Sequence, residues 1–357
     1  MTTLVPPTES APPGRGGMRD EPDELEPVQV TGRGPAPNAL ERAARLVVPA
    51  IGEAVARLGP ELRLPVEHHL EGGGKHVRAA LALLTAAAAG APEATGLPGA
   101  VAIELVHNFS LLHDDIVDED TERRHRPTVW ARFGVGRAIV AGDALATLAM
   151  QVLLDDPTSE RVRATAALAG ATQAMIAGQA DDMAFESRLT VTVEECLRME
   201  EGKTGALLAC AASLGAILAG ADGPTVQALA DFGSHLGVAF QAVDDLLGVW
   251  GEPAVTGKPV GSDLYRHKKT LPVATALGRS GDQADELRSI LHAEVLSPAD
   301  VRRATDLLET CGARQEVMAF ADAHFDLAMQ ALRRVPLAAG PVAELEAVAV
   351  FVVARDR

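Results

Sequence analysis

The chain has 357 residues, of which only 3% are aromatic, and alanine and leucine dominate its composition. A chain of this length can bury a sizeable core as one large domain or two ordinary ones. Because it lacks alternating β-branched runs, we expect it to be all-α. The formal net charge of −17 argues against nucleic acid as a partner, since binding a phosphate backbone needs a basic surface.

The cysteines and the apolar segments of the chain indicate the cellular compartment in which we expect the protein. Cys196, Cys210 and Cys311 form no CxxC pair, which excludes a disulfide framework or a zinc site of the usual spacing and fits a reducing cytoplasm. The N-terminus lacks the compact apolar core of a signal peptide. The uncharged segment from Gly205 to Ala221 approaches membrane-span length but is mostly alanine and glycine. We therefore expect a buried core helix there and no membrane span.

Residues 1–38 form a tail with eight prolines, five glycines, mixed charges and no period. Such a segment cannot bury enough apolar surface to offset the entropy of ordering it, so we expect it to be disordered. It is either an inert tail or a docking tag for a partner or a compartment. We expect residues 39–357 to form a single all-α domain, because no fixed repeat interrupts the helices that follow.

Apolar residues recur with helical spacing along this domain. In chain order, the expected elements are a helix that carries Arg45, Val48, Ile51 and Val55, then helices over Lys75–Ala89, Leu97–Asp118, Arg137–Leu154, Ser159–Glu186 and Thr225–Val249, and a glycine- and proline-rich loop over Gly251–Asp263. Thr192 and Glu195 have the spacing of a capping box that opens a further helix. Ser297 and Pro298 supply an N-cap and a first-turn proline for a helix that ends near Leu308.

The first aspartate cluster, Asp114, Asp115 and Asp118, lies where an apolar helix ends, in the sequence LLHDDIVDED. Asp114 and Asp118 are one turn apart and share a helix face, so their charges repel each other. Acidic residues at a helix C-terminus also oppose the helix dipole, which favours cations there. A solvated acidic helix end is the alternative. The preceding apolar residues favour burial instead, and buried carboxylates need cations beside them.

A second aspartate cluster, Asp244 and Asp245, lies far downstream in FQAVDDLLG. Phe240 and Leu247 mark an apolar side of this helix, and Gln241 belongs to its polar side. A structural pair of buried aspartates is the alternative to a metal site. Two acidic clusters on facing helices predict a Mg²⁺ site, and Mg²⁺ held by few carboxylates usually completes its shell with substrate phosphate oxygens. We therefore expect phosphate chemistry in a helical pocket.

Several basic residues follow glycines or lie near the aspartates. Gly72–Gly74 precedes Lys75, and Arg78 follows three residues later, so we expect both bases on the first turn of a helix. A helix N-terminus adds partial positive charge there. Further cations near loops and helix ends are Lys203, Lys258, Lys268 and Lys269. Solvated surface bases are the alternative. In an acidic protein this pattern favours two phosphate sites, one bound by metal and one bound by bases.

Together these elements resemble the trans-type polyprenyl diphosphate synthases. The resemblance runs from about Gly72 to Thr270 and rests on the order and spacing of many motifs. The motifs are GGGKHVR, ELVHNFSLLHDDIVDEDTERRHRPT, Gly142-Asp143, Gly178-Gln179, Lys203-Thr204, FQAVDD, and TGKPVGSDL followed by KKT. The resemblance implies an isoprenoid-synthase-type helical bundle around a central cavity.

The resemblance also implies roles for individual residues. The first cluster would hold Mg²⁺ on an allylic diphosphate and the second would bind another Mg²⁺, with three ions in each active site. The residues that match bases for the allylic diphosphate are Arg123, Lys203 and Lys258, and those that match the isopentenyl diphosphate site are Lys75, Arg78, His107 and Arg124, with Lys268 a further lysine at the second site. Thr204 and Gln241 match polar residues beside the developing carbocation.

Two positions depart from the pattern that is usual in the family. Gly248 stands where a third aspartate is usual in the second motif, and His76 stands where arginine is common.

The length of the product chain in this family depends on the residues that close the floor of the hydrophobic channel, here Phe109 and Ser110. An aromatic ring five residues before Asp114 implies a short product, geranylgeranyl diphosphate first and farnesyl diphosphate second. Packing in the core is the alternative role for Phe109.

The resemblance implies a Mg²⁺-dependent, homodimeric, cytoplasmic enzyme that transfers an allylic prenyl group to isopentenyl diphosphate. A class I terpene cyclase is one alternative, but it would normally carry an Asn/Ser/Glu metal motif late in the chain and aromatic residues to steer cations. A non-catalytic regulatory subunit of a prenyl synthase is another. Such a subunit would be expected to lack one aspartate motif, and this chain keeps both.

Overall fold

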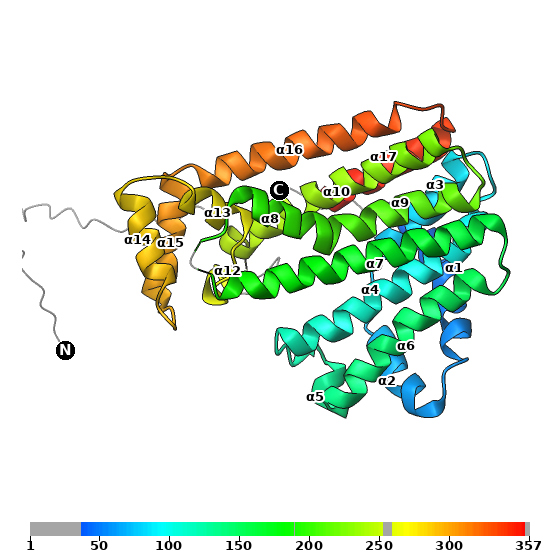
Figure 1. Cartoon of the computed structure of the whole chain (residues 1–357), viewed down its shortest axis with the longest axis horizontal. Coiled ribbons are helices and arrows are strands. Elements are labelled where there is room, and N and C mark those ends of the chain that lie inside the picture. Colours follow the sequence, from blue (N-terminus) through cyan, green and yellow to red (C-terminus); the bar gives the residue numbers. More distant parts are fainter. Residues whose placement is uncertain (1–36, 189, 253–258, 354–357) are drawn as a thin grey trace, which may run out of the picture.

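The computed structural model describes residues 37–188, 190–252 and 259–353, and these fold into a helical assembly (Figure 1). The first elements are α1 (Asn38–Val55), α2 (Pro60–Leu70), α3 (Val77–Ala88), η1 (Glu93–Gly96), α4 (Leu97–Val117), β1 (Glu122–Arg123), β2 (Arg126–Pro127), α5 (Val129–Phe133), α6 (Val135–Leu154) and α7 (Ser159–Glu186). They are followed by α8 (Val193–Glu200), η2 (Glu201–Gly205), α9 (Ala206–Leu218), α10 (Gly223–Trp250), α12 (Ser262–Tyr265), α13 (Leu271–Leu277), α14 (Asp282–Leu291), α15 (Pro298–Thr310), α16 (Ala313–Leu332) and α17 (Ala339–Val353).

Several helix boundaries agree with the sequence. The predicted helix over Ser159–Glu186 is α7, residue for residue. The capping box of α8 forms as predicted: Glu195 N–H donates to Thr192 Oγ1 (3.2 Å), and Thr192 N–H donates to the Glu195 carboxylate (2.9 Å). Ser297 caps α15 in the same way. These bonds join residues three positions apart, so the local sequence is enough to specify them.

The centre of the assembly is built from α3, α4, α9 and α10, whose inward residues are mostly small or aliphatic. Glycines let these helices approach closely. A Cβ added at Gly215 of α9 would lie 2.0 Å from Ala82 O of α3, and one at Gly233 of α10 would lie 2.3 Å from Leu208 O of α9. The segment expected to be a buried core helix is α9, and it is buried almost throughout. The all-α prediction is confirmed, since only β1 and β2 form a ladder in the described part of the chain.

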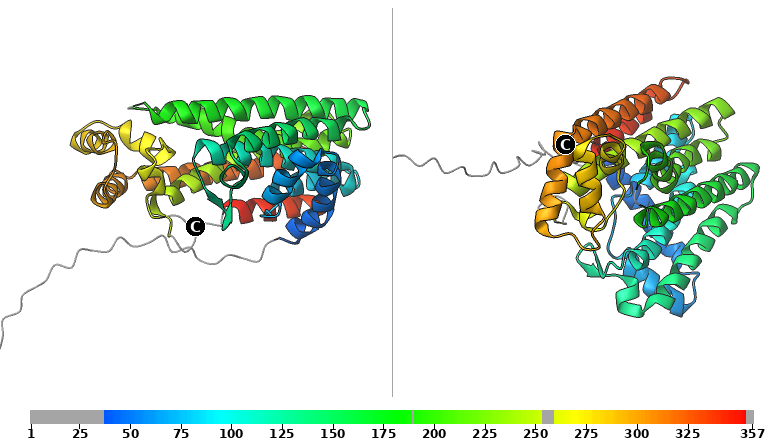
Figure 2. Two further views of the ribbon diagram at one scale, coloured as in Figure 1. Left: turned by 90° about the horizontal axis from the view of Figure 1, so that it is seen from below. Right: turned by 60° about the vertical axis from the view of Figure 1, so that its left-hand side comes forward.

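The long helices form a bundle with a smaller cluster at one end. In Figure 1, α16 runs beside α10, and α6 runs beside α4. At the end nearest α12, α14 and α15 stand across the bundle and pack with α12 and α13 in a separate hydrophobic cluster (Figure 2). Val249 and Trp250, the last residues of α10, belong to this cluster. The smaller cluster therefore anchors the end of the helix that carries the second aspartate cluster.

The prediction for the start of α3 is wrong. The helix begins at Val77 rather than Lys75, because Gly73 (φ 66°) and His76 (φ 52°) have left-handed backbone conformations that an α-helix cannot contain. Arg78 lies on the first turn of α3 as expected. Lys75 lies in the loop that precedes it.

Two further predictions, one on the N-terminal tail and one on membrane spans, can be compared with the described residues. Of the predicted tail, residues 1–38, only Pro37 and Asn38 fall within them, and Asn38 is the first residue of α1. Among the described helices, α6 alone is long and apolar enough to cross a membrane. Core helices of water-soluble proteins pass the same test, and α6 packs Ala141 and Leu145 into the core against α4. Its composition is therefore weak evidence for a span.

Candidate active site

The first aspartate cluster lies at the C-terminal end of α4. Asp115 is 1% exposed. Its Oδ1 accepts a hydrogen bond from Arg123 Nε (2.7 Å), whereas its buried Oδ2 has no hydrogen-bond partner. Burial raises the pKa of Asp115 to about 6, although Arg123 opposes the rise. Burial also raises the pKa of Asp114, against the charge of Lys203. Carboxylates held in this way gain stability from an added cation.

The second aspartate cluster lies near the C-terminal end of α10. Asp245 is 3% exposed; its Oδ1 accepts from Gln241 Nε2 (2.9 Å), and its Oδ2 accepts from Leu271 N–H (2.7 Å). Gln241 Oε1 in turn accepts from Thr204 Oγ1 (2.9 Å). Asp245 therefore ties α10 to the start of α13, while Asp244 beside it lines a cavity. The π-helical turn η2 brings Thr204 to this chain of hydrogen bonds.

A buried acid and a buried thiol lie beside Asp245. The side-chain oxygens of Glu200 and Asp245 and the Cys196 sulfur all lie within 4.8 Å of one another. Burial and the charge of Asp245 raise the pKa of Glu200 well above its usual range, and burial raises the pKa of the Cys196 thiol. Burial raises the pKa of Asp245 to about 6. Burial therefore favours the neutral forms of Glu200 and Cys196, and we interpret the trio as a support for Asp245.

A cavity of about 90 Å³ opens at the second cluster. Its polar lining comprises Asp182, Glu200, Lys203, Thr204, Gln241, Asp244, Asp245, Asp263, Lys268, Lys269 and Thr270. Lys203 and Asp182 form an ion pair across it. Burial alone would lower the pKa of Lys268, but the charges of Asp118, Asp182 and Asp263 raise it. Because Asp118 belongs to the first cluster, Lys268 lies between the acidic residues of both. The second cluster lines this cavity, which we call the central cavity, and the charges of Lys203 and Lys268 link it to Asp114 and Asp118 of the first cluster.

The departure at Gly248 has a structural counterpart. A Cβ added at Gly248 would lie 1.9 Å from Asp263 Oδ2, so the Asp263 carboxylate occupies the space that a side chain at 248 would take. Asp263 comes from α12 and lines the central cavity with Asp244. A carboxylate from another element therefore stands beside the position of the missing third aspartate.

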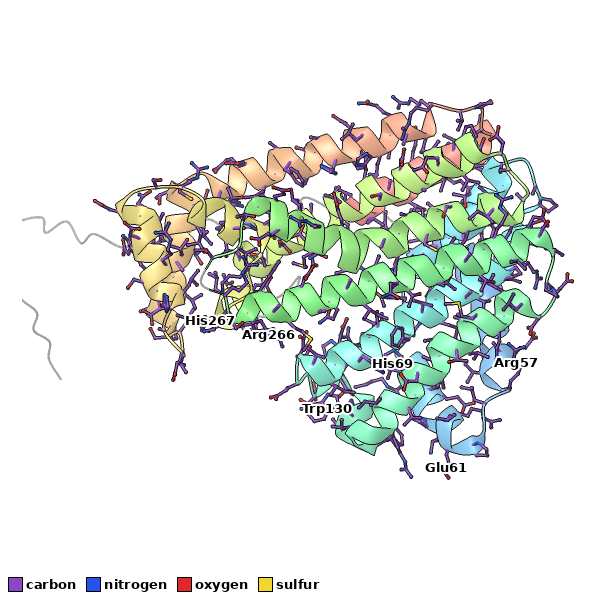
Figure 3. All side chains as sticks on the ribbon, in the orientation of Figure 1. Arg57, Glu61, His69, Trp130, Arg266 and His267 are labelled. Atoms are coloured by element: carbon purple, nitrogen blue, oxygen red, sulfur yellow. The ribbon has the colours of Figure 1, made fainter. Side chains whose placement is uncertain are left out.

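Arg266, which is labelled in Figure 3, follows α12 and pairs with Asp118 of the first cluster. Its guanidinium lies 3.6 Å from Asp118 Oδ2 and 2.5 Å from Asp120 Oδ1. These two ion pairs join the end of α4 to the segment after the predicted loop. The segment that carries Asp263 is therefore linked by charge to the end of α4.

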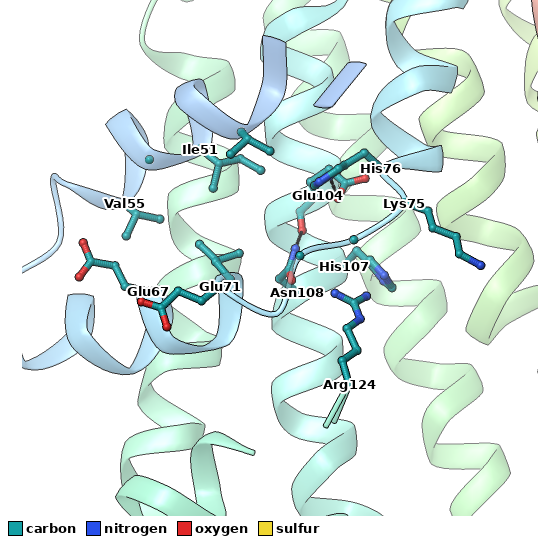
Figure 4. A pocket seen from close by; sticks show the side chains of 15 residues that line it. Ile51, Val55, Glu67, Glu71, Lys75, His76, Glu104, His107, Asn108 and Arg124 are labelled. Carbon is teal, nitrogen blue, oxygen red and sulfur yellow. Dashed lines mark hydrogen bonds and ion pairs between the residues drawn. The ribbon is translucent and has the colours of Figure 1, made fainter. Parts of the chain in front are cut away.

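A second group of bases lies between α4, the loop before α3 and the turn after β1 (Figure 4). Burial, followed by the charges of Arg78 and Arg124, lowers the pKa of His107 well below its usual range, so its imidazole is neutral. The buried Arg78 Nε has no hydrogen-bond partner. Burial lowers the pKa of His69 to about 4, with a further contribution from Arg123. Cations gathered around neutral imidazoles, with unused donors, are suited to an anionic ligand.

The remaining predicted residues fall in three places. Phe109 is 8% exposed in the core of α4, and its ring packs edge-on against His113 at 4.9 Å between centroids. Ser110 Oγ donates to His107 O (2.9 Å), so it caps the backbone of its own helix. Lys75 lies with its Nζ 5.9 Å from the Phe351 ring centroid. Lys258 lies outside the described residues.

Sequence reasoning missed Asp182, Asp263 and Glu200 as members of the site. Asp181 and Asp182 form another adjacent pair of aspartates, just after the Gly178-Gln179 motif, and that position could have identified Asp182. Asp263 lies in the TGKPVGSDL motif, of which only the lysine, Lys258, was assigned a role from the sequence. Glu200 gave no signal, because a glutamate in an amphipathic helix normally faces solvent.

Comparison with known proteins relates this arrangement to characterised enzymes. Residues 59–308 match the family described as polyprenyl synthetase. The (2E,6E)-farnesyl diphosphate synthase of Mycobacterium tuberculosis is 44% identical over 332 residues, which cover 89% of this chain and 92% of that protein. The geranylgeranyl diphosphate synthase of the same organism is 43% identical over 307 residues, covering 82% and 87%.

Solved structures agree with these relatives. The crystal structure of a polyprenyl synthetase from Streptomyces coelicolor A3(2) is 46% identical, with a TM-score of 0.85, and covers 88% of this chain and 99% of that chain. A geranylgeranyl pyrophosphate synthetase from Pyrococcus horikoshii Ot3 is 35% identical with a TM-score of 0.83, covering 88% and 98%. The predicted isoprenoid-synthase-type bundle is thereby confirmed.

Proposed function

The chain belongs to the polyprenyl synthetase family, and we propose that it is a Mg²⁺-dependent prenyltransferase that condenses isopentenyl diphosphate with an allylic diphosphate. The observation that carries this proposal is that Lys203 and Lys268, which line the central cavity with the second aspartate cluster, also interact by charge with the first cluster. These lysines link acidic residues of α4 and α10, and a separate group of bases lies between α4, the loop before α3 and the turn after β1. An acidic site suits a diphosphate that is bound through metal ions, and a basic site suits a diphosphate that is bound directly by side chains.

The donor set of the two aspartate clusters and Asp263 fits Mg²⁺. Its acidic side chains offer carboxylate oxygens, which hard divalent cations prefer, and the buried Asp115 Oδ2 has no hydrogen-bond partner. We infer that Asp114, Asp118 and Asp244 hold the ions, three in each active site as the family resemblance implies, with Asp115 and Asp245 behind them. We further infer that Asp263 acts in place of the third aspartate that Gly248 lacks. Bound Mg²⁺ would neutralise the diphosphate as it leaves.

The protein's own groups then divide the work. Lys203 and Lys268 bind oxygens of the allylic diphosphate, and Thr204 and Gln241 present their oxygens toward the carbocation that develops as the C–O bond breaks. The alkene of isopentenyl diphosphate forms the new carbon–carbon bond, the diphosphate keeps the electron pair, and a proton is lost to it. No protein nucleophile takes part. The enzyme positions two substrates and keeps water away from the cation.

The isopentenyl diphosphate is assigned to the second group of bases. Lys75, Arg78 and Arg124 supply positive charge, and the neutral His107 supplies a hydrogen bond. A neutral imidazole suits this role, because a charged one would add to an already repulsive set of cations. Arg123, held by Asp115, and Lys258 are assigned to the allylic diphosphate.

We propose geranylgeranyl diphosphate as the product, with farnesyl diphosphate second. Phe109 lies more than one helical turn before Asp114, and its position is supported by His113, whose Nε2 lies 3.1 Å from Ile139 O of α6. A ring held in this way is suited to stop a growing chain, while Ser110 leaves space beside it. The two Mycobacterium tuberculosis relatives have nearly equal identity and different products.

We also propose a homodimer in the cytoplasm. Large apolar side chains are exposed on two neighbouring helices: Val135, Ile139, Val140 and Leu154 on α6, and Val162, Ile176 and Met183 on α7. A second copy of the chain would cover them. The cysteines are unpaired, as expected in a reducing compartment. Light scattering of the purified protein would test the dimer.

The deciding experiment is incubation with isopentenyl diphosphate, Mg²⁺ and each allylic primer in turn, followed by sizing of the products. A linear C20 or C15 diphosphate supports the proposal. A cyclised hydrocarbon would instead indicate a terpene cyclase. Failure to turn over any primer, in a folded protein, would indicate a regulatory subunit.

A further inference from the structure

Two histidines on neighbouring helices lie in contact, and the proposed reaction uses neither of them. His235 lies near the middle of α10 and His324 near the middle of α16, and these helices run side by side (Figure 1). The two Nδ1 atoms are 3.3 Å apart, and the ring planes are inclined at 71°. Both residues are only partly buried, so a small ion can reach them from solvent.

The distance between the two nitrogens matches that of two ligands on one tetrahedral metal ion. Zinc–imidazole bonds are about 2.0–2.1 Å long, so at the tetrahedral angle two such nitrogens lie about 3.3–3.4 Å apart. At the right angles of an octahedral shell, the same bonds would bring them to about 2.9 Å. A hydrogen bond between the rings is the alternative, but the observed 3.3 Å exceeds the range of about 2.7–3.2 Å that is usual for N–H···O bonds.

The charges around the two rings also favour a cation. Burial lowers the pKa of His235; Asp231 and Glu201 oppose that change, and Arg334 adds to it. Burial, followed by the charge of His235, lowers the pKa of His324. Both rings therefore tend to be neutral, which is the form of imidazole that binds metal. Two acids and one base around neutral rings leave a net negative surrounding, which suits a dication.

Packing holds both rings in place before any ion binds. On α10, His235 is followed by the fully buried Leu236. On α16, the ring centroid of His324 lies 4.4 Å from that of Phe320, one turn earlier on the same helix. Because α10 and α16 pack against each other, the position of one imidazole is fixed relative to the other. Ligands that the fold positions in this way lose little entropy when they bind an ion.

We propose that His235 and His324 bind a zinc ion, or a similar transition-metal dication, at a site separate from the aspartate clusters. Each ring keeps its proton on Nε2 and presents the lone pair of Nδ1 to the ion, and water molecules complete the tetrahedral shell. His235 lies nine residues before Asp244, which is about 13 Å along α10. Mg²⁺ does not compete here, because it prefers oxygen ligands in an octahedral shell. The bound ion joins α10 to α16 and stabilises the folded chain.

Titration calorimetry with Zn²⁺ would test the site in protein that carries no histidine tag. Excess Mg²⁺ in the buffer keeps the aspartate clusters occupied by the ion proposed for them. We expect wild type to bind one zinc ion per chain that Mg²⁺ does not displace, and His235→Gln and His324→Gln each to weaken this binding at least tenfold. His292→Gln is the matched control, because His292 is exposed at the end of α14 and lies outside the pair, and it should bind zinc as wild type does.

Thermal unfolding gives a second measurement. Zn²⁺ should raise the Tm of wild type and of His292→Gln equally and leave the Tm of the two pair variants unchanged. Equal zinc affinity in wild type and both pair variants would overturn the inference. Zinc binding that Mg²⁺ abolishes would also overturn it, since the ion would then belong to the aspartate clusters. Neither measurement uses a substrate, so this site and the proposed function can fail independently of each other.

Discussion

Gly248→Ala tests whether Asp263 acts in place of the missing third aspartate. The added Cβ would lie 1.9 Å from Asp263 Oδ2, so one of the two groups must move. The obstructing atom is the end of a side chain, and rotation of Asp263 is the easiest response. Alanine gains about 1 kcal/mol over glycine within a helix, against an overpacking cost of about 1–3 kcal/mol. We expect a net change in unfolding free energy of at most about 2 kcal/mol, but a displaced carboxylate.

The assay is the Mg²⁺ dependence of turnover, with urea denaturation as the measure of stability. We expect Gly248→Ala to need several times more Mg²⁺ for half-maximal rate and to recover at high Mg²⁺. Gly340→Ala, in open surroundings, should leave the Mg²⁺ dependence unchanged. Combining Gly248→Asp with Asp263→Gly moves the carboxylate onto α10 and should restore most of the Mg²⁺ affinity. A stable Gly248→Ala protein with wild-type Mg²⁺ dependence would refute the reasoning.

Three further predictions concern the aspartate clusters and the neighbouring Phe109. Asp114→Ala and Asp244→Ala should each lower turnover by orders of magnitude, and wild-type rates in both would disprove the metal assignment. Phe109→Ala should lengthen the product, as chromatography of the prenyl chains would show; an unchanged distribution would mean that the ring only packs in the core. Asp115 and Asp245 have pKa values of about 6 in the fold against an ordinary 3.8, so the folded state binds more protons between these values. Without Mg²⁺, thermal unfolding should therefore show stability falling as pH rises from about 4 to 6, and saturating Mg²⁺ should reduce that loss.

The sequence predicted the parts of the site that are written in adjacent residues. The aspartate pairs, Lys203-Thr204 and Gln241 could be assigned because their spacing within one helix is short and regular. The left-handed turn at His76 could not be predicted, since a histidine in that conformation carries no distinctive signal, and it removed Lys75 from the helix. Phe109 was placed on the correct helix, but its partner His113 was not foreseen.

What the sequence determined by itself was therefore local: the helical periodicity, the caps of α8 and α15, and the motifs that identify the family. Tertiary structure alone decided that Asp263 fills the space beside Gly248, that Glu200 lies against Asp245, and that α1 closes a cavity next to the bases. These contacts join residues that are far apart along the chain. Hydrogen bonding and side-chain spacing act over a few residues, whereas such contacts depend on how whole helices pack, which no local pattern encodes.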